Sequence, residues 1–480
     1  MPTASDGHVT TFDASSPDCT VNVTGACQSL DFTGFANVLT MTSAISCTSG
    51  TITFQANQAS RIAGAGLLTL ANTTTIIANG ATWNNALTFS VTSTKTVTGT
   101  LTVTGLFTSG SSTTQTVNGG TLVLNGGMTI NGTTTGTTNV TLAGGTWSGA
   151  SALQNNLTFA GNVTVSGSVA YNTGTITRLS GTITTTGSTL TVASISATFD
   201  TNSTTWNNLS FTGTGVTHTL ISDLTLTGTL SVQSTNGTTL TFNGFTLYIG
   251  GNFTQSTTSA IITGTTEFVY NGTGTWSSAT TQQLRSNLTI NTAGTLTISG
   301  NVNYNSGVFA YVAGTVITTG STITVASTSA TTFNTAGIVF DNMIFNFAAT
   351  ITINSLLSAT GTVSLTLNTT FAGSAGWTFG TVSVTTADHV LKSGLTYTIT
   401  TNLTVTGTAA NNGSFTSSIG GSQAILTLQQ GATQDIDFCS ATDIDSRLGL
   451  TIAPYKATTL SNASNWRQMP TQQVSVGRMG

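Results

Sequence analysis

Charged side chains are scarce in this chain. Asp, Glu, Lys and Arg make up 5% of its 480 residues, against about 25% in an ordinary soluble domain. The 9 basic and 13 acidic residues give a formal net charge of -4, and no basic cluster is present that would neutralise nucleic-acid phosphates or anionic lipid headgroups. The apolar runs fall short of the roughly 18 residues that a membrane-spanning helix needs. We therefore expect neither nucleic-acid binding nor membrane insertion.

Strong helix formers are also rare. The sequence contains a single Glu, Glu267, and three Lys residues, whereas β-branched Thr, Val and Ile are abundant. These residues favour strands over helices. Because 38% of the residues are hydrophobic and the net charge is small, the composition is that of a folded chain and not of a disordered one. We expect an all-β protein whose surface carries hydroxyl and amide groups in place of charges.

Cysteine is sparse as well. Cys19, Cys27 and Cys47 lie near the N-terminus and Cys439 lies near the C-terminus. Four cysteines do not make a disulfide framework in a chain of this length, and no C-x-x-C pair is present to bind zinc. Two interpretations stay open. Two of the N-terminal cysteines, such as Cys27 and Cys47, form a disulfide, or the cysteines are buried free thiols.

The N-terminal sequence lacks the features of a secretory signal peptide. Residues 1–10 contain neither a basic segment nor an apolar one, and a signal peptide needs both. A composition suited to the cell exterior without an export signal is expected of a virion component that is released by lysis, or of a sequence that is part of a longer protein.

Glycine and short alternating runs are plentiful, with 53 Gly residues in the chain. One strand-and-turn phrase, typified by Leu-Thr-Val-Thr-Gly, recurs at Leu101, Val163, Leu224, Leu296 and Leu403, with a weaker copy at Leu357. Alternating apolar and polar residues bounded by Gly are typical of half-buried strands joined by tight turns. A repeat of about 60 residues is too long for one coil of a β-solenoid, so each repeat is expected to contain two or three coils.

A longer duplication is also present. Residues 167–194 match residues 300–327 at a constant offset of 133, and both copies then continue with a shift of one residue. We therefore expect residues 153–211 and 284–345 to have the same structure.

Stacked coils of short strands account for these repeats. One side chain of every two, including Leu226, points into a core that only stacking with the next coil closes. Positive-φ corners are expected at the Asn-Gly pairs, which begin at residues 79, 118, 125, 131, 236, 243, 271 and 412. The predicted fold is a single right-handed parallel β-helix, or β-solenoid, with terminal caps.

Acidic residues gather toward the two ends of the chain and suggest where the caps lie. The predicted organisation is an N-terminal cap or attachment region over 1–45, a repeat β-solenoid over 46–430 and a C-terminal cap over 431–480.

No catalytic motif is found. Adjacent strand residues point to opposite faces, so Asp388 and His389 are not expected to form a dyad. The acids between the ends of the chain are Asp200, Asp223, Glu267, Asp341 and Asp388. Glycan-cleaving enzymes need two carboxylates about 5 to 9 Å apart, and only Asp200 and Asp223 are candidates for neighbouring coils. The favoured interpretation is isolated acids at turns, and no catalytic, cofactor-binding or metal-binding residue is predicted.

Two further patterns have alternative interpretations. The segments Asp435-Ile-Asp437 and Asp443-Ile-Asp445 either supply Ca²⁺ ligands or form a polar cap edge with Ile436 and Ile444 pointing inward.

Five tryptophans within the solenoid region either form a sugar-stacking stripe or pack in the core, and core packing is favoured. They are Trp83, Trp147, Trp206, Trp276 and Trp377.

Phrases near the two ends of the chain carry a resemblance. They are Pro2-Thr-Ala, Phe12-Asp-Ala-Ser-Ser16, Cys19-Thr-Val-Asn and Cys27-Gln-Ser-Leu-Asp-Phe-Thr-Gly34, and then Ala441-Thr-Asp-Ile-Asp-Ser446 and Asn462-Ala-Ser-Asn-Trp466. In these phrases the chain resembles Thr/Gly/Asn-rich structural proteins of tailed bacteriophages. The resemblance implies a virion fibre, spike or decoration.

The predicted function is that of a non-enzymatic virion structural protein of a tailed phage. It would be a fibre, spike or head or tail decoration that presents a rigid adhesive rod at the extracellular surface of the virion. The predicted partners are other virion proteins, copies of the same chain in a homo-oligomer, and a host surface glycan, and no cofactor is predicted. The alternatives are a bacterial or archaeal extracellular adhesin or surface-filament subunit, and a glycan-depolymerising tailspike.

Overall fold

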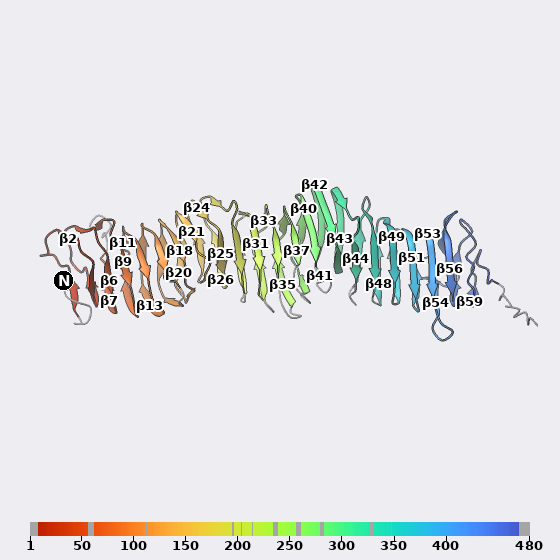
Figure 1. Ribbon diagram of the computed structural model, residues 1–480, viewed down its shortest axis with the longest axis horizontal. Helices are drawn as coiled ribbons and strands as arrows, with labels where there is room; N and C mark the ends of the chain where they lie inside the picture. Colours follow the sequence, from red (N-terminus) through yellow and green to blue (C-terminus); the bar gives the residue numbers. More distant parts are fainter. Residues whose placement is uncertain are drawn as a thin grey trace, which may run out of the picture. The chain divides into compact units, whose positions relative to one another are not determined.

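The computed structural model describes residues 8–55, 62–111, 114–193, 196–202, 204–213, 215–233, 239–255, 261–278, 283–326, 330–346 and 348–469. The chain divides into two compact units. Unit 1 comprises residues 1–233 and 240–248, and unit 2 comprises residues 234–239 and 249–480. Within the described residues every regular element is a β-strand, and the strands stack in parallel as a β-solenoid (Figure 1). No helix among them is long and apolar enough to cross a membrane. The predicted all-β parallel solenoid is confirmed.

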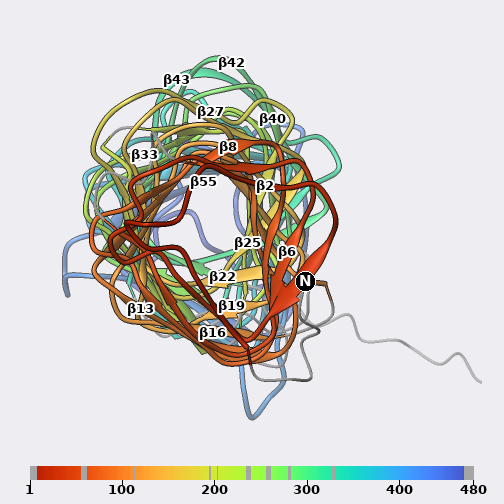
Figure 2. The same ribbon diagram turned by 90° about the vertical axis from the view of Figure 1, so that its left-hand side faces the viewer.

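In unit 1 a coil consists of three short strands, and most of these strands pair with the third strand after them. The first two coils are formed by β1 (Val9–Thr11), β2 (Cys19–Val21) and β3 (Gly25–Cys27), then by β4 (Ser29–Asp31), β5 (Leu39–Met41) and β6 (Ile45–Cys47). Strand β1 pairs with β4, β2 with β5 and β3 with β6, all in parallel. Figure 2 shows these first coils end-on, with β2 and β6 on different sides.

The register gives the length of a coil. Leu101 pairs with Leu122 on the next coil. In the same way, Oγ1 of Thr42 donates to the carbonyl oxygen of Val21 on the preceding coil, 21 residues earlier. A repeat of about 60 residues therefore corresponds to three coils, within the predicted range of two or three.

One side of unit 1 is a nine-stranded sheet made of every third strand. Its members are β3, β6, β9 (Leu68–Leu70), β12 (Leu87–Phe89), β15 (Phe107–Ser109), β18 (Gly127–Ile130), β21 (Thr146–Ser148), β24 (Val163–Val165) and β27 (Ile183–Thr184). In-register stacking aligns alternate side chains into ladders. Leu70 and Phe89 form part of an inward ladder and are both buried, whereas Thr88, next to Phe89 on its strand, faces outward. Burial of each such Leu or Phe side chain contributes roughly 1.5 to 3 kcal/mol.

Unit 2 contains longer strands, and one such strand forms two adjacent sides of a coil. Strands β49 (Leu357–Leu365), β51 (Trp377–Thr385) and β53 (Thr396–Thr406) pair in succession, so the partner here is the second strand along the chain. The pairing of β51 with β53 shifts its register between Phe379 and Thr381. Such a bulge bends the strand, and one strand can therefore turn a corner that separates two strands in unit 1.

The two sequence duplicates have corresponding strands. The matched pairs are β28 (Thr189–Val192) with β44 (Thr322–Val325), β29 (Ala197–Asp200) with β45 (Thr331–Asn334), β30 (Thr205–Trp206) with β46 (Val339–Phe340), and β31 (Asn208–Phe211) with β47 (Asn342–Phe345). The first pair keeps the constant offset of the sequence match, and the other three pairs are each shifted by one further residue, so the shift falls between β44 and β45. One difference is that three strands, β25 (Ser168–Tyr171), β26 (Gly174–Arg178) and β27, correspond to a single strand, β43 (Asn301–Ile317).

The Asn-Gly prediction holds for three of the seven pairs that the structure describes. Positive φ occurs at Asn79 and Gly80 and at Gly119 and Gly244. The pairs that begin at residues 125, 131, 271 and 412 have no positive φ, and the pair at 236 lies outside the described residues. At Gly272 the need for glycine is steric, because a Cβ there would collide with the carbonyl oxygen of Gly250 on the preceding coil.

The predicted domain boundaries do not coincide with a change in stacking. Strand β6 spans the boundary at 45/46, and β55 (Ala424–Leu428) pairs with β58 (Ile444–Asp445) across the boundary at 430/431. Parallel stacking thus extends into both segments that are predicted as caps.

Candidate functional site

The Asp200 and Asp223 side chains do not lie level on successive coils. Phe199 pairs with Leu220. Asp200 directly follows Phe199, whereas Ile221 and Ser222 separate Asp223 from Leu220. Oδ1 of Asp223 accepts a hydrogen bond from the backbone N–H of Thr246 at 3.0 Å. The geometry therefore gives Asp223 a structural contact with the following coil.

Two other mid-chain acids have the same kind of contact. Oε1 of Glu267 accepts a hydrogen bond from Oγ1 of Thr289, 22 residues on, at 2.8 Å. Oδ2 of Asp341 accepts a hydrogen bond from the backbone N–H of Gly320, 21 residues back, at 2.6 Å. These carboxylates link one coil to the next at turns and strand ends.

Asp388 and His389 lie on opposite faces of β52 (Asp388–Leu391), as the alternation predicts. The His389 ring is completely buried, and neither ring nitrogen has a hydrogen-bond partner. Burial lowers the pKa of His389 to about 4, although the Asp388 carboxylate opposes this shift. Asp388 is exposed, and its Oδ1 accepts a hydrogen bond from Oγ of Ser414 at 2.5 Å. The two residues do not form a dyad.

A polar cleft of about 280 Å³ adjoins Asp388 in unit 2. Its lining residues are Asn368, Thr386, Ala387, Asp388, Ala410, Asn411 and Asn412. Hydrogen bonds hold two parts of its wall in place. Oδ1 of Asn368 accepts the backbone N–H of Asp388 at 2.8 Å, and Nδ2 of Asn412 donates to Oγ of Ser440 at 2.7 Å. A small cleft with amide, hydroxyl and carboxylate groups suits a hydroxyl-rich ligand.

The turn that forms one wall of the cleft lengthens its coil. Asp388 pairs with Ser414, 26 residues on. The preceding coil is shorter, because Asn368, which contacts Asp388 from that coil, lies 20 residues earlier. The extra chain forms a turn in which the N–H of Thr408 donates to the carbonyl oxygen of Asn411 at 2.7 Å. This longer turn supplies Ala410, Asn411 and Asn412 to the wall of the cleft.

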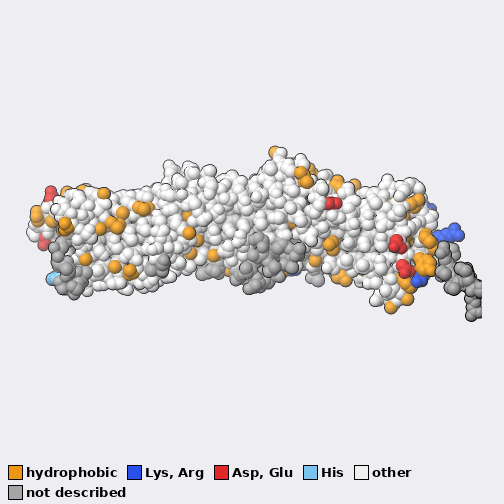
Figure 3. Space-filling view, in the orientation of Figure 1, with side chains coloured by type: hydrophobic (Ala, Val, Ile, Leu, Met, Phe, Trp, Pro, Cys, Tyr) orange, Lys and Arg blue, Asp and Glu red, His pale blue; other side chains and the backbone are white. Residues whose placement is uncertain are grey.

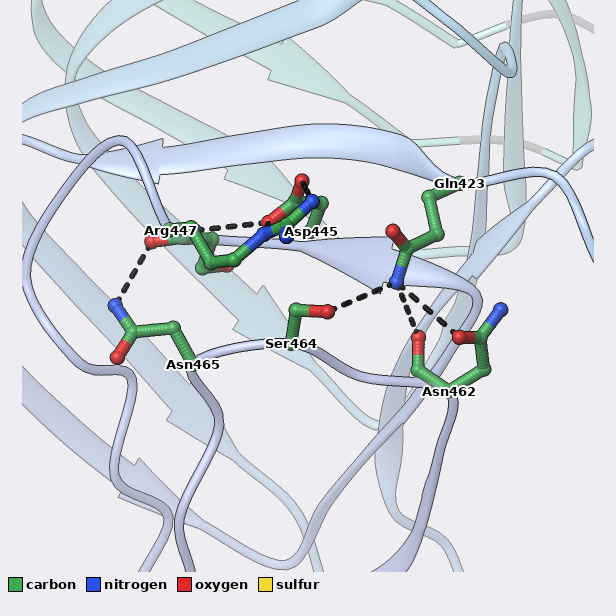
Figure 4. A network of polar contacts seen from close by, with 7 residues as sticks. Gln423, Asp445, Arg447, Asn462, Ser464 and Asn465 are labelled. Carbon is green, nitrogen blue, oxygen red and sulfur yellow. Dashed lines mark hydrogen bonds and ion pairs between the residues drawn. The ribbon is translucent and has the colours of Figure 1, made fainter.

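Asp443 and Asp445, two of the four acidic residues near the C-terminus, are hydrogen-bonded to protein donors. Arg447 binds Asp445 through two hydrogen bonds, from Nε to Oδ1 at 2.9 Å and from a terminal guanidinium nitrogen to Oδ2 at 2.7 Å (Figure 4). These hydrogen bonds lower the pKa of Asp445. Asp443 accepts hydrogen bonds from Nδ2 of Asn462 at 2.5 Å and from the backbone N–H of Gly421 at 2.9 Å, and both lower its pKa. No group of three or more His, Cys, Asp or Glu residues that could hold a metal ion is found among the described residues.

Neutral side chains complete this network. Nε2 of Gln423 donates to the carbonyl oxygen of Asn462 at 2.7 Å and to Oγ of Ser464 at 3.2 Å (Figure 4). Ile436 and Ile444 point inward and are buried, as the cap-edge interpretation predicts. Ile444 thus packs in the core between two aspartates that are hydrogen-bonded to protein donors.

The five tryptophans considered for sugar stacking pack in the core. Trp83, Trp147, Trp206, Trp276 and Trp377 are each no more than 1% exposed. The core-packing interpretation is therefore confirmed, and a sugar-stacking stripe is excluded for these five residues.

His218 of unit 1 is also a core residue. Its Nδ1 accepts the backbone N–H of Ala197 at 3.2 Å, and its ring lies 4.6 Å from the ring of Phe211. Burial lowers the pKa of His218 to about 4.

Lys95 on β13 (Ser93–Thr98) is a buried cation that the sequence analysis missed. Its Nζ donates to the carbonyl oxygens of Ala71 at 2.9 Å and Asn72 at 2.7 Å, and it contacts Oγ of Ser93. Burial lowers the pKa of Lys95 to about 8. The strand alternation carries the signal, because Lys95 is in phase with buried Val97.

Comparison with known proteins found no relative. No protein-family model, no curated protein and no solved structure matches the chain.

Proposed function

We propose that this chain is a non-enzymatic structural protein of a tailed-phage virion, a fibre, spike or decoration that presents a rigid adhesive rod. The observation that carries the proposal is the combination of an apolar stacked interior with a surface almost free of charge. Most of the surface in Figure 3 belongs to uncharged polar side chains and backbone, with acidic and basic atoms concentrated near the chain ends.

The physical properties of the stack suit a mechanical role. Each coil hydrogen-bonds to its neighbours through parallel strands, and inward ladders bury apolar side chains in both units. Bending such a stack would separate ladder contacts and backbone hydrogen bonds together, so its coils resist deformation. The carboxylates of Asp223, Glu267 and Asp341 also support the stiffness of the stack, because each accepts a hydrogen bond from a neighbouring coil.

The C-terminal phrases of the bacteriophage resemblance form one structural cluster. Nε1 of Trp466 donates to Oγ of Ser446 at 2.9 Å, and Nδ2 of Asn465 donates to the carbonyl oxygen of Ser446 at 2.9 Å. Residues from the two phrases thus contact each other directly. This contact supports the proposal that the two phrases form one structural element. The N-terminal Pro2 phrase lies outside the described residues.

Adhesion in this proposal involves the cleft beside Asp388. Its exposed carboxylate and asparagine side chains can hydrogen-bond to sugar hydroxyls, which makes a host surface glycan a fitting ligand. Other virion proteins and copies of the chain are the remaining proposed partners. An extracellular adhesin or surface-filament subunit would use the same properties, and the location of the protein distinguishes it.

Cryo-electron microscopy of the assembly that contains the native protein tests the proposal. The expected result is density for the solenoid on a phage capsid or tail. Finding the solenoid in a filament attached to a cell would reject the virion assignment and support the adhesin alternative.

A hydrolysis assay tests the tailspike alternative separately. Wild-type protein, Asp200→Asn and Asp223→Asn are incubated with purified surface polysaccharide from candidate hosts, and released reducing ends are measured. The proposal expects no release above a heat-inactivated control. Release by the wild type that either substitution abolishes would identify a glycan-cleaving enzyme.

A further inference from the structure

Two thiols meet at the N-terminal end of unit 1. Cys27 on β3 pairs in register with Cys47 on β6, and their Sγ atoms are 3.2 Å apart. Cys27 is 4% exposed and Cys47 is fully buried. All four cysteines are free thiols in the structure. The other two differ in their surroundings, because Cys19 donates to the carbonyl oxygen of Pro17 and Cys439 to that of Ser440.

The backbone geometry at this pair is compatible with a disulfide. Neighbouring strands lie about 4.7 to 4.9 Å apart, and the Cα atoms of a disulfide are usually about 4.4 to 6.8 Å apart. The sulfurs must approach from 3.2 Å to about 2.05 Å. Strand β3 is the last member of its nine-stranded sheet, so within the described residues it pairs only with β6. A shift of β3 toward β6 therefore does not separate it from another strand.

The Cys27 thiol borders a small cavity that an oxidant could enter. Cys27 lines an apolar cavity of about 40 Å³, together with Phe12, Val21 and Ile45. A cavity of this size admits a molecule about as large as water. The hydrogen bond from Cys47 lowers the pKa of Cys27, while the same contact and burial raise the pKa of Cys47. Cys27 is therefore the thiol that more readily becomes the reactive thiolate.

We propose that Cys27 and Cys47 are a peroxide-oxidisable pair that forms a disulfide between the first two coils. The Cys27 thiol loses its proton, and the thiolate attacks one oxygen of hydrogen peroxide and becomes a sulfenic acid. The hydroxide that leaves takes up the proton and becomes water. The sulfur of Cys47 then attacks the Cys27 sulfur, the S–S bond forms, and the sulfenic oxygen leaves as water. Two thiols and one peroxide thus give one disulfide and two waters, with two electrons passing from sulfur to oxygen.

The bond would fasten the first coil of unit 1 to the second. Strands β1, β2 and β3 each pair with one following strand, to β4, β5 and β6. A link between residues 27 and 47 closes a short loop and reduces the freedom of the opened first coil. Oxidation is therefore expected to slow local opening at the N-terminal end of unit 1. This inference is independent of the proposed virion role.

Mass spectrometry of the full-length protein tests the proposal. Reduced wild-type protein is treated with hydrogen peroxide and alkylated without reduction. It is then digested with chymotrypsin, because no Lys or Arg lies between residues 27 and 47 while Phe32 and Phe35 do. The expected product is a cross-linked pair of peptides with a mass about 2 Da below the sum of the reduced peptides, since two hydrogens are lost.

Matched variants identify the bond. Cys27→Ser and Cys47→Ser are expected to abolish the cross-linked product, and Cys439→Ser and Cys19→Ser are expected to retain it. Circular dichroism checks that each variant keeps its strands. Addition of oxygen to Cys27 without a cross-link, or oxidation of Cys19 in its place, would overturn the proposal.

Hydrogen exchange provides a second readout. In the oxidised wild type the amides of β1 to β6 are expected to exchange at least roughly tenfold more slowly than in the reduced protein. The amides of unit 2 serve as the internal reference. Equal exchange in a protein that carries the bond would reject the fastening role.

Discussion

The ring of His389 packs against the ring of Phe415 on the following coil, with 5.9 Å between their centroids. The two residues are paired in register on β52 and β54 (Gly413–Ser417). A histidine thus occupies a place in an apolar ladder, and its protonation would put a charge where neither ring nitrogen has a partner. His218 has an equivalent position among the phenylalanines of unit 1.

Stability should fall in mild acid because of these histidines. Burial lowers the pKa of His218 and His389 to about 4 in the folded chain, from about 6.5 in the unfolded chain. The unfolded state therefore binds more protons between these values, and stability is lost as the pH falls from about 6.5 to about 4. Each histidine accounts for up to about 3 kcal/mol.

Urea unfolding of the wild type and of His389→Leu at pH 7 and pH 4.5 measures this loss. The variant, which has a similar side-chain volume and no proton to gain, should lose less stability in acid because only His218 then contributes. An equal loss in both proteins would show that His389 is accessible to protons in the folded state.

Lys95 should give unit 1 a further rise in stability with pH, in mild alkali. Burial lowers its pKa to about 8, so the unfolded chain binds more protons between this value and about 10.4. Stability should rise as the pH increases from 8 to 9.5, by up to about 2 kcal/mol. Lys95→Met, which keeps the aliphatic stem, should abolish the rise when unfolding is monitored by circular dichroism. A rise that persists in the variant would assign it to another group.

Gly272 should be intolerant of any side chain. A Cβ at this position would collide with the carbonyl oxygen of Gly250, and the coils would have to separate. Gly272→Ala is expected to destabilise unit 2 by about 1 to 3 kcal/mol. Gly420→Ala is the matched control, because open space surrounds Gly420 and its φ is not positive. Thermal unfolding gives the melting temperature of each variant. Similar melting temperatures would mean that the coils move apart at Gly272 without a loss of stability.

Leu226 and Thr225 on β33 (Leu224–Leu226) test the strand phase. Leu226 is fully buried, and Thr225 faces outward. Leu226→Asp should cost more than about 3 kcal/mol, because it puts an unpaired carboxylate in the core. Thr225→Asp should cost less than about 0.5 kcal/mol. Hydrogen exchange of the β33 amides measures the loss of stability in each variant. A greater loss in Thr225→Asp than in Leu226→Asp would be incompatible with the observed register.

Strand phase and coil stacking were predictable because both depend on alternation within a few residues. Leu226 obeys this alternation, and so does Lys95. The burial of Lys95 was not predicted, because charged residues are expected to face solvent. Only the local acceptors at Ala71 and Asn72 make a buried lysine tolerable, and their position requires the corner geometry.

The cleft and the glycine contacts were not predictable for a different reason. The cleft depends on where the turn at 408–412 lies against Asn368 on an earlier coil. The clash at Gly272 likewise depends on how closely it approaches Gly250 on the preceding coil. Neither distance follows from residue type alone, whereas the Cys27–Cys47 contact follows once the register is known.

The short spacing between paired strands has a consequence for synthesis of the chain. In the first coils of unit 1 the partner of a strand is the third strand before it. That partner lies about one coil, or roughly 20 residues, earlier in the sequence. Each new coil can therefore pair with a coil that has already folded. The entropic cost of closing the loop between paired strands is small and is about the same for every added coil. Unit 1 can thus assemble from its N-terminal end as it leaves the ribosome, with each finished coil protecting the edge of the one before it.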